Sequence, residues 1–276
     1  MIFSVSVDLD GLGCYAAIHG LPPLEDRWLR VVPETALGRF LELFEALRLP
    51  ATFFVIGSEA QYYRSLPGPP HEIASHSFAH DYAMSRWPAP EIARDLERCE
   101  QALGSKPRGF RAPGYTISPA LLDAVRERGY LYDSSLLPSP VYYAAKAAAI
   151  GWYALRRRKS VSILGAPGQL FASRRPHLRR GLRELPIATT PLLRAPVIGT
   201  TVLALPRLAR LAGDFVNLEL HAIDLLDASD VPPELAAAQP GLRMPVSGKL
   251  RRLRSVLSSL PGEARTLEVA AREMLP

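Results

Sequence analysis

The sequence predicts an α/β protein in which parallel strands alternate with helices, in either a barrel or a doubly wound arrangement. Short apolar runs of strand length recur along the chain, and amphipathic segments of helical length separate them. Polar residues follow these runs directly, as at the carboxyl ends of parallel strands where active sites collect. The chain has 276 residues, 48% of them hydrophobic and 22% charged, which is ordinary for a soluble protein with a sizeable core. We expect a single domain over residues 1–276.

The first half of the chain has the clearest alternation. Residues 2–8 are a run of apolar and small side chains typical of a buried parallel strand. Residues 33–47 predict an amphipathic helix, because Pro33 lies near its start and Leu and Phe recur at helical spacing. The later predicted elements are strands at 51–56, 73–74, 109–111 and 130–133, a loop at 61–70, and helices at 89–103 and 118–128. Ser118 is the expected cap of the last of these helices.

The second half is less regular. From residue 138 to residue 182 the alternation breaks, and residues 142–155 are rich in Ala and aromatic side chains. Four basic residues follow directly at 156–159. The rest of the chain contains a proline-rich stretch at 186–206, a strand at 215–220 that ends in His221, and a basic amphipathic helix at 249–260.

Two pairs of polar residues follow predicted strands at metal-ligand spacing. His76 and His80 lie four residues apart, so one helical turn would place both imidazoles on the same face, as half of a divalent metal site. Asp8 and Asp10 lie two residues apart at a strand end, where their carboxylates share a face and repel each other unless a cation lies between them. Each pair alone has an ordinary alternative, a solvated turn for the histidines and an Asp-Gly turn for the carboxylates.

Further polar residues occupy equivalent positions after other predicted strands: Arg111, Asp133 and His221. We therefore expect one site, in which Asp10, His76 and His80 bind one divalent ion and leave open positions for water and substrate. Zinc is the expected ion, although nitrogen and oxygen ligands also admit other first-row metals.

The remaining residues then have roles in hydrolysis. Asp8 is the expected general base, and Arg111 pairs with Asp8 and lowers its pKa, or holds it in orientation. His221 is the expected general acid, which protonates the leaving amine or alkoxide. Asp224 or Asp133 would orient His221 through its second ring nitrogen. Taken singly, Arg111 could be a surface residue and His221 a buried strand-end histidine.

With these residues, the chain resembles the polysaccharide deacetylase family, the carbohydrate esterases with a NodB-homology domain. Residues 8–10 (Asp-Leu-Asp) are similar to the family's first motif, in a spaced form that resembles a divergent branch rather than the adjacent aspartates of many members. Residues 76–80 (His-Ser-Phe-Ala-His) match the motif His-Ser/Thr-x-x-His. Residues 111–115 (Arg-Ala-Pro-Gly-Tyr) match Arg-x-Pro-x-aromatic, and residues 220–221 (Leu-His) resemble the last motif.

The resemblance implies a distorted (β/α) barrel with about seven parallel strands. It implies the same base, metal ligands and acid, and it adds Pro113 and Tyr115 as residues that contact the substrate in the groove. It covers about residues 1–135 and 183–227, which leaves an insertion at about 138–182.

The formal net charge of +6 is concentrated in basic clusters. No nucleic-acid-binding module or aromatic stacking platform accompanies them, so we do not expect a nucleic-acid partner. Residues 142–159 combine aromatic side chains with four cations and are too short to span a bilayer. They predict either a helix packed over the barrel mouth or an interfacial helix on anionic lipid.

The cellular location is also an expectation from the sequence. Only two cysteines occur, Cys14 and Cys99, and no signal-peptide pattern precedes the first strand. We expect a cytoplasmic protein, with peripheral contact at the inner membrane face as the alternative.

The expected activity is metal-dependent removal of an acyl group, N-acetyl foremost, from a sugar or glycan. One alternative is a deformylase or deacetylase of a lipid-linked sugar at the cytoplasmic membrane face, or a hydrolase of a small amide. The other alternative belongs to a different class, a non-catalytic carbohydrate- or membrane-binding descendant of the fold. A complete set of base, acid and metal ligands argues against that second alternative, and the metal content of the purified protein tests it.

Overall fold

The computed structural model describes residues 1–157, 160–211 and 213–276. Its centre is a sheet with the strand order β6-β7-β5-β4-β3-β2-β1-β8, and β9 pairs with β1. The strands are β1 (Ile2–Asp8), β2 (Thr52–Val55), β3 (Glu72–Ser75), β4 (Gly109–Phe110), β5 (Tyr132–Asp133), β6 (His177–Arg179), β7 (Leu182–Glu184), β8 (Phe215–His221) and β9 (Glu263–Ala264). Among the described residues, the seven strands from β7 to β8 are parallel, and β6 runs antiparallel to β7. The predicted parallel α/β fold is therefore confirmed.

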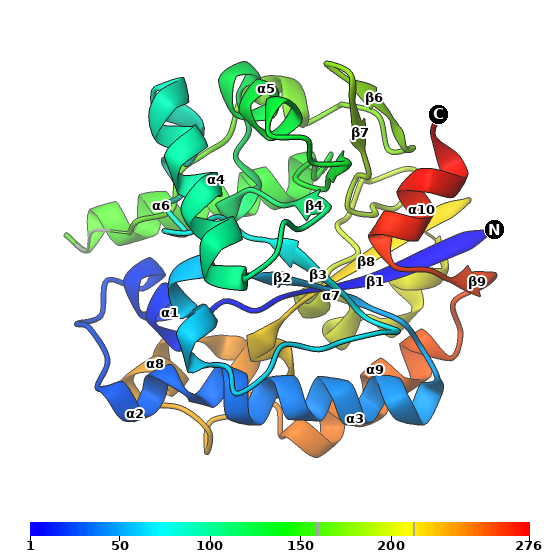
Figure 1. Ribbon diagram of the computed structural model, residues 1–276. Coiled ribbons are helices and arrows are strands. Elements are labelled where there is room, and N and C mark those ends of the chain that lie inside the picture. The colour runs from blue at the N-terminus through cyan, green and yellow to red at the C-terminus, as the bar shows by residue number, and fades with distance from the viewer. Residues whose placement is uncertain (158–159, 212) are drawn as a thin grey trace.

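Helices cover the outside of this sheet (Figure 1). They are α1 (Leu12–Ile18), α2 (Asp26–Leu29), α3 (Leu37–Leu47), α4 (Ala89–Leu103), α5 (Pro119–Glu127), α6 (Pro140–Leu155), α7 (Gly199–Ala204), α8 (Pro233–Ala238), α9 (Val246–Leu257) and α10 (Leu267–Met274). In Figure 1, α3 and α9 lie below the sheet and α4 and α5 lie above it. None of the helices in the described part of the chain is both long and apolar enough to cross a membrane.

The sheet curls, so that strands far apart in its order face each other across an interior. Asn217 on β8 donates through Nδ2 to the hydroxyl of Ser134, which follows β5, over 2.9 Å. Side chains of β1 and β8 alternate between this interior and the outer core, as the period of a strand requires. Val5 and Val7 pack into the large outer core, whereas Ser6 and Asp8 point inward. The barrel interior is therefore polar near the carboxyl ends of the strands.

Helix α10 closes the opposite end of the barrel. Its buried residues Leu267, Ala270 and Ala271 pack against Phe54, Tyr132 and other apolar side chains of the inner face. Glu72 at the start of β3 fixes the helix, because its Oε2 accepts the backbone N–H of Glu268 over 2.9 Å.

The observed elements agree with most of the predicted ones. Ser118 caps α5 as expected, since its hydroxyl accepts the N–H of Leu121 over 3.2 Å. The helix predicted at 33–47 starts as a π-helical turn over Val32–Ala36 and continues as α3. Helices α1, α2, α7, α8 and α10 were not predicted, and each of them has eight residues or fewer.

Candidate active site

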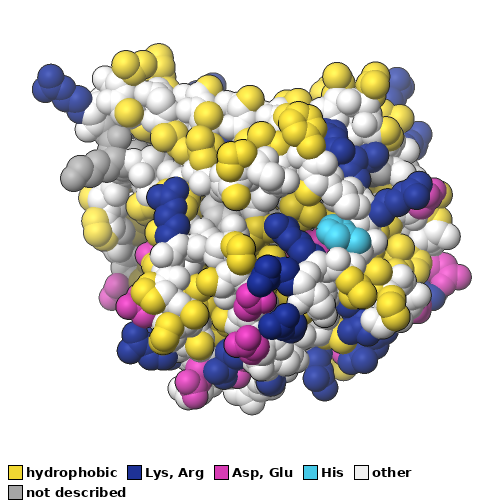
Figure 2. Space-filling view, turned by 90° about the horizontal axis from the view of Figure 1, so that it is seen from above, with side chains coloured by type: hydrophobic (Ala, Val, Ile, Leu, Met, Phe, Trp, Pro, Cys, Tyr) yellow, Lys and Arg dark blue, Asp and Glu magenta, His cyan; other side chains and the backbone are white. Residues whose placement is uncertain are grey.

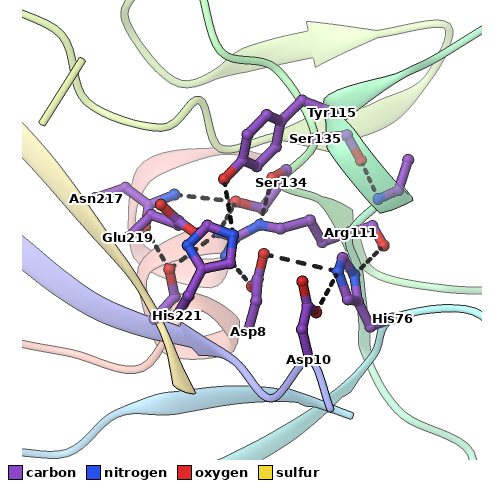
Figure 3. A network of polar contacts seen from close by, with 12 residues as sticks. Asp8, Asp10, His76, Arg111, Tyr115, Ser134, Ser135, Asn217, Glu219 and His221 are labelled. Carbon is purple, nitrogen blue, oxygen red and sulfur yellow. Dashed lines mark hydrogen bonds and ion pairs between the residues drawn. The ribbon is translucent and has the colours of Figure 1, made fainter. Parts of the chain in front are cut away.

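Five of the polar residues predicted at strand ends lie together at one end of the barrel (Figure 3): Asp8, Asp10, His76, Arg111 and His221. In the parallel register of β1 and β8, Asp8 lies opposite His221. His76 follows β3 and Arg111 follows β4, the next strand in the sheet. Because carboxyl ends of parallel strands share one edge, residues separated by up to 213 positions in sequence, such as Asp8 and His221, become neighbours.

Asp10, His76 and His80 form a group with the geometry of a metal site. Oδ1 of Asp10 lies 3.3 Å from Nε2 of His76 and 3.4 Å from Nε2 of His80. Ligand atoms about 2.0–2.1 Å from a tetrahedral ion stand about 3.3 Å from one another, so these separations match. Oδ1 of Asp10 and Nε2 of His80 are buried and have no hydrogen-bond partner. One carboxylate oxygen and two imidazole nitrogens with unsatisfied buried atoms fit a divalent ion such as zinc.

The two histidines reach this position from a loop, which corrects the prediction of a helical turn. Ser77 and His80 have positive φ angles of 62° and 49°, so the chain between them does not coil as a helix. The carboxylate of Asp95 on α4 accepts the backbone N–H groups of Phe78 and Ala79 over 2.8 and 2.9 Å, and it holds the loop in this shape.

The backbone also fixes the tautomer of His76. Nδ1 of His76 lies 2.8 Å from the carbonyl oxygen of Arg111, which only accepts, so Nδ1 carries the proton. In the neutral ring, Nε2 is then the nitrogen without a proton, and it is directed toward Asp10. Burial would raise the pKa of Asp10, but the imidazoles of His80 and His76 lower it well below its ordinary value.

Arg111 is fully buried and holds Asp8. Nη1 of Arg111 lies 2.6 Å from Oδ1 of Asp8. The rest of the guanidinium donates to the Ser134 carbonyl, the Ser134 hydroxyl and the Ser6 hydroxyl over 2.8, 2.9 and 3.0 Å. Its Cζ atom lies 4.0 Å from the ring centre of Phe54. Burial raises the pKa of Asp8 above its ordinary value, although Arg111 and His76 each lower it. The structure thus contains the predicted Arg111–Asp8 pair, while burial outweighs the predicted lowering of the pKa.

His221 pairs with Glu219, which corrects the predicted partner. Nδ1 of His221 lies 2.9 Å from Oε1 of Glu219. Asp224 instead accepts the backbone N–H of His221 over 2.8 Å, and Asp133 accepts the hydroxyl of Ser135. Burial would lower the pKa of His221, but the carboxylate of Glu219 raises it well above its ordinary value. This raised pKa favours the imidazolium form of His221, whose second nitrogen is directed toward Tyr115 (Figure 3).

The motif at 111–115 contributes two residues to the cavity wall. The hydroxyl of Tyr115 lies 3.4 Å from Nε2 of His221, and Gly114 lies beside it. Gly114 has a φ of 59°, and a Cβ there would approach the ring of Tyr82 to 2.5 Å, so only glycine fits. Pro113, which was predicted to contact substrate, is buried and is not among the residues that line the cavity.

A cavity of about 330 Å³ opens above these residues. Asp8, Asp10, His76 and His221 line one side of it. The opposite side is α6, which contributes Tyr142, Ala145, Lys146, Ala149, Ile150 and Tyr153. The segment 142–159 was predicted to lie beside the site opening, and its described part does so. Arg158 and Lys159 are not among the described residues.

Three supporting residues were missed by the sequence prediction. Glu219 and Ser6 precede His221 and Asp8 by two residues on strands, so the period of a strand already places each pair on one face. That signal was present in the sequence and identifies both residues. Asp95 carries no such signal, because its position on α4 does not indicate that it meets the loop of His76 and His80.

Parts of the chain are similar to known proteins. A family model described as "Polysaccharide deacetylase" matches residues 28–132. A peptidoglycan deacetylase of Helicobacter pylori is 23% identical over 146 residues, which cover 50% of this chain and 50% of that protein. The chain therefore spans about half the length of the curated relatives it matches.

Solved structures share the fold. A candidate polysaccharide deacetylase from Mycobacterium smegmatis superposes with a TM-score of 0.60 at 17% identity, over 99% of this chain and 89% of that chain. A pseudoenzyme of carbohydrate esterase family 4 from Bacillus anthracis superposes with a TM-score of 0.50 at 12% identity, over 98% of this chain and 65% of that chain. The fold is thus the distorted (β/α) barrel that the sequence predicted.

Proposed function

We infer that the chain belongs to the polysaccharide deacetylase family, and we propose that it is a metal-dependent hydrolase of an acylated sugar or glycan, with N-acetyl as the group removed. The observation that carries the proposal is the arrangement of Asp8 and His221 beside the Asp10–His76–His80 group in a single cavity. A non-catalytic descendant of the fold has no need of a base, an acid and a metal site together.

The residues divide the work of hydrolysis between them. A divalent ion held by Asp10, His76 and His80 would supply Lewis acidity, which polarises an acyl carbonyl and acidifies water. Asp8 takes one proton from the attacking water, and its bond to Arg111 keeps the carboxylate oriented. As the new carbon–oxygen bond forms and the carbon–nitrogen bond breaks, Nε2 of His221 donates a proton to the leaving nitrogen. The products are a free amine and a carboxylate.

A direct assay tests this activity. The metal-loaded protein is incubated with acetylated and formylated sugars, both free and polyprenyl-linked, and the released acid and amine are measured. The Asp8→Asn variant should keep the metal, because Asp8 is not one of the three ligands, and lose activity by about 10²-fold or more. A protein that binds no divalent metal and releases no acid from any of these sugars would belong with the non-catalytic relatives.

We further propose that the substrate is presented at a membrane surface, through residues 142–159. Trp152 and Leu155 on α6 are 54% and 82% exposed, and Arg156 follows with its guanidinium 4.1 Å from the Trp152 ring centre. An exposed aromatic and aliphatic pair beside cations suits the headgroup region of anionic lipid. Figure 2 shows a band of hydrophobic side chains along the upper edge of one face, with Lys and Arg side chains beside it. A cytoplasmic protein at the inner membrane face, acting on a lipid-linked sugar, would combine these features.

A further inference from the structure

Lys146 lies on the α6 side of the active-site cavity, across from the strand-end residues. Its Nζ donates to the carbonyl oxygen of Gly114 over 3.0 Å. The ammonium group packs closely against this glycine, since a Cβ on Gly114 would lie 3.3 Å from Nζ. The ammonium group is therefore held at a defined position on the cavity wall and does not swing freely in solvent.

This ammonium group has unsatisfied capacity. It carries three N–H donors, of which one bonds to Gly114, and no carboxylate within the described ranges lies at ion-pair distance from it. Burial lowers the pKa of Lys146 to about 8, and no acidic neighbour offsets that effect. A partly buried cation without an anionic partner is costly unless a ligand supplies one.

Lys249 provides a comparison, as a buried lysine with a structural role. Its Nζ donates to the carbonyl oxygens of Ile223 and Leu226 over 3.2 and 2.5 Å. Burial lowers the pKa of Lys249, and the nearby carboxylates of Asp224 and Asp227 offset part of that effect. Lys249 does not line the active-site cavity. Lys146 differs in both respects, because it faces the cavity and lacks a charged partner.

We propose that Lys146 binds an anionic substituent, a carboxylate or a phosphate, on the acylated sugar whose hydrolysis is proposed above. Ser160 and Ser162 line the same cavity and add hydroxyl groups, while Ala145 and Ala149 of α6 line it with apolar surface that strengthens a charge pair. Lys146 lies on the α6 side of the cavity, across from the metal site, so a substituent bound to Lys146 leaves the acyl group directed to the metal site. Lys146 would thereby select acidic sugars and set their orientation.

The test compares matched sugars in matched variants. Turnover of N-acetylmuramic acid and of N-acetylglucosamine 1-phosphate is measured against neutral methyl N-acetylglucosaminide, with metal-loaded wild type, Lys146→Met and Lys106→Met. Lys106 is exposed and outside the cavity, so its substitution removes the same charge without touching the site. Lys146→Met should lower kcat/KM for one or both acidic sugars by roughly 10- to 100-fold, mainly through KM, and leave the neutral sugar within about twofold. The acidic sugar that responds identifies carboxylate or phosphate as the group bound.

A purely structural clamp between α6 and Gly114 gives a different result. It would lower turnover of the neutral and acidic sugars by the same factor, and that outcome overturns the proposal. Wild type that does not prefer either acidic sugar overturns it as well.

Binding separates this inference from the proposed hydrolysis. If no sugar is hydrolysed, calorimetric titration of the zinc-loaded protein with N-acetylglucosamine 1-phosphate and with the neutral glycoside still tests Lys146. The phosphate should bind more tightly to wild type and lose that advantage in Lys146→Met. An advantage that persists in Lys146→Met would assign the anion to the metal or another group and would refute the role of Lys146.

Discussion

At the scale of single residues, the site is built from buried polar groups that satisfy one another in part. Arg111 uses its donors on Asp8, Ser6 and Ser134, and His221 is held by Glu219. Asp10 and His80 keep buried atoms without a partner. Buried polar atoms are normally paired, so the facing unpaired atoms of Asp10 and His80, 3.4 Å apart, suit a bound ion.

Replacing the two histidines should remove the metal without unfolding the chain. In the variant with both His76→Ala and His80→Ala, only the Asp10 carboxylate remains of the three ligands, which is too few for tight binding. Elemental analysis should find the purified variant free of divalent metal, and circular dichroism should match that of wild type. Full metal occupancy in this variant would place the metal elsewhere.

Glu219 should control the alkaline side of the pH profile. Its carboxylate raises the pKa of His221, so the acid stays protonated to higher pH. In Glu219→Gln the negative charge is absent, the pKa of His221 falls, and the alkaline limb of kcat/KM should move to lower pH. Asp224→Asn is the control, because Asp224 contacts the backbone of His221 and not its ring. If the alkaline limb of kcat/KM does not move in Glu219→Gln, or moves equally in both variants, Glu219 is rejected as the partner of His221.

At the scale of elements, the ends of the barrel differ in what they contain. The carboxyl ends of the strands carry the site, and α6 covers them from one side. The other end is closed by α10, which rests on Phe54 and Tyr132 and is tied to β3 through Glu72. The segment 138–182, for which the sequence predicts an insertion, contains α6, and α6 supplies one cavity wall.

Glu72 should make stability depend on pH. Burial raises its pKa in the folded protein to about 7 from an ordinary value of 4.5, despite donors from the Glu268 backbone, Tyr132 and Thr52. The folded state then binds a proton that the unfolded state has lost, so this contribution is fully present at low pH and disappears as pH rises from about 4.5 to about 7. Glu72→Gln should reduce the fall in unfolding free energy over that range by roughly 3 kcal/mol at most. Denaturant titrations of wild type and Glu72→Gln at several pH values measure the unfolding free energy of each protein. If the two free energies fall in parallel as pH rises, the role of Glu72 is contradicted.

At the scale of the whole molecule, charge and exposed apolar surface bear on location. The formal net charge is +6 and the isoelectric point is about 9.5, which favours anionic surfaces in general. The exposed Trp152 and Leu155 belong to the same helix that lines the cavity with Tyr142 and Tyr153. A membrane bound to that helix would therefore lie close to the site.

Vesicle binding tests the membrane contact. The protein should bind vesicles that contain anionic lipid, and binding should weaken as salt rises. Replacing Arg156, Arg157, Arg158 and Lys159 by Gln should abolish it. The matched control replaces four exposed cations outside this segment, Arg64, Arg94, Lys106 and Arg108, and should retain binding. Wild type that ignores anionic vesicles at low salt would leave α6 as a wall of the cavity and remove the main support for a lipid-linked substrate.

The sequence by itself determined which strand ends carry chemistry. Asp8, Asp10 and His221 follow or end apolar runs, and the topology of parallel strands brings such positions to one edge wherever the intervening helices lie. Local periodicity also sets the face of each strand residue, which is why Glu219 could have been found from His221.

Only the tertiary structure decided the contacts across the barrel. The turn after β8 directs Asp224 to the backbone of His221, which leaves the ring to Glu219. Whether Lys146 faces the cavity or solvent depends on how α6 docks against Gly114. These contacts depend on the curl of the sheet and on how the helices dock against it. Both are set by twist and packing over many residues, so no short stretch of sequence predicts them.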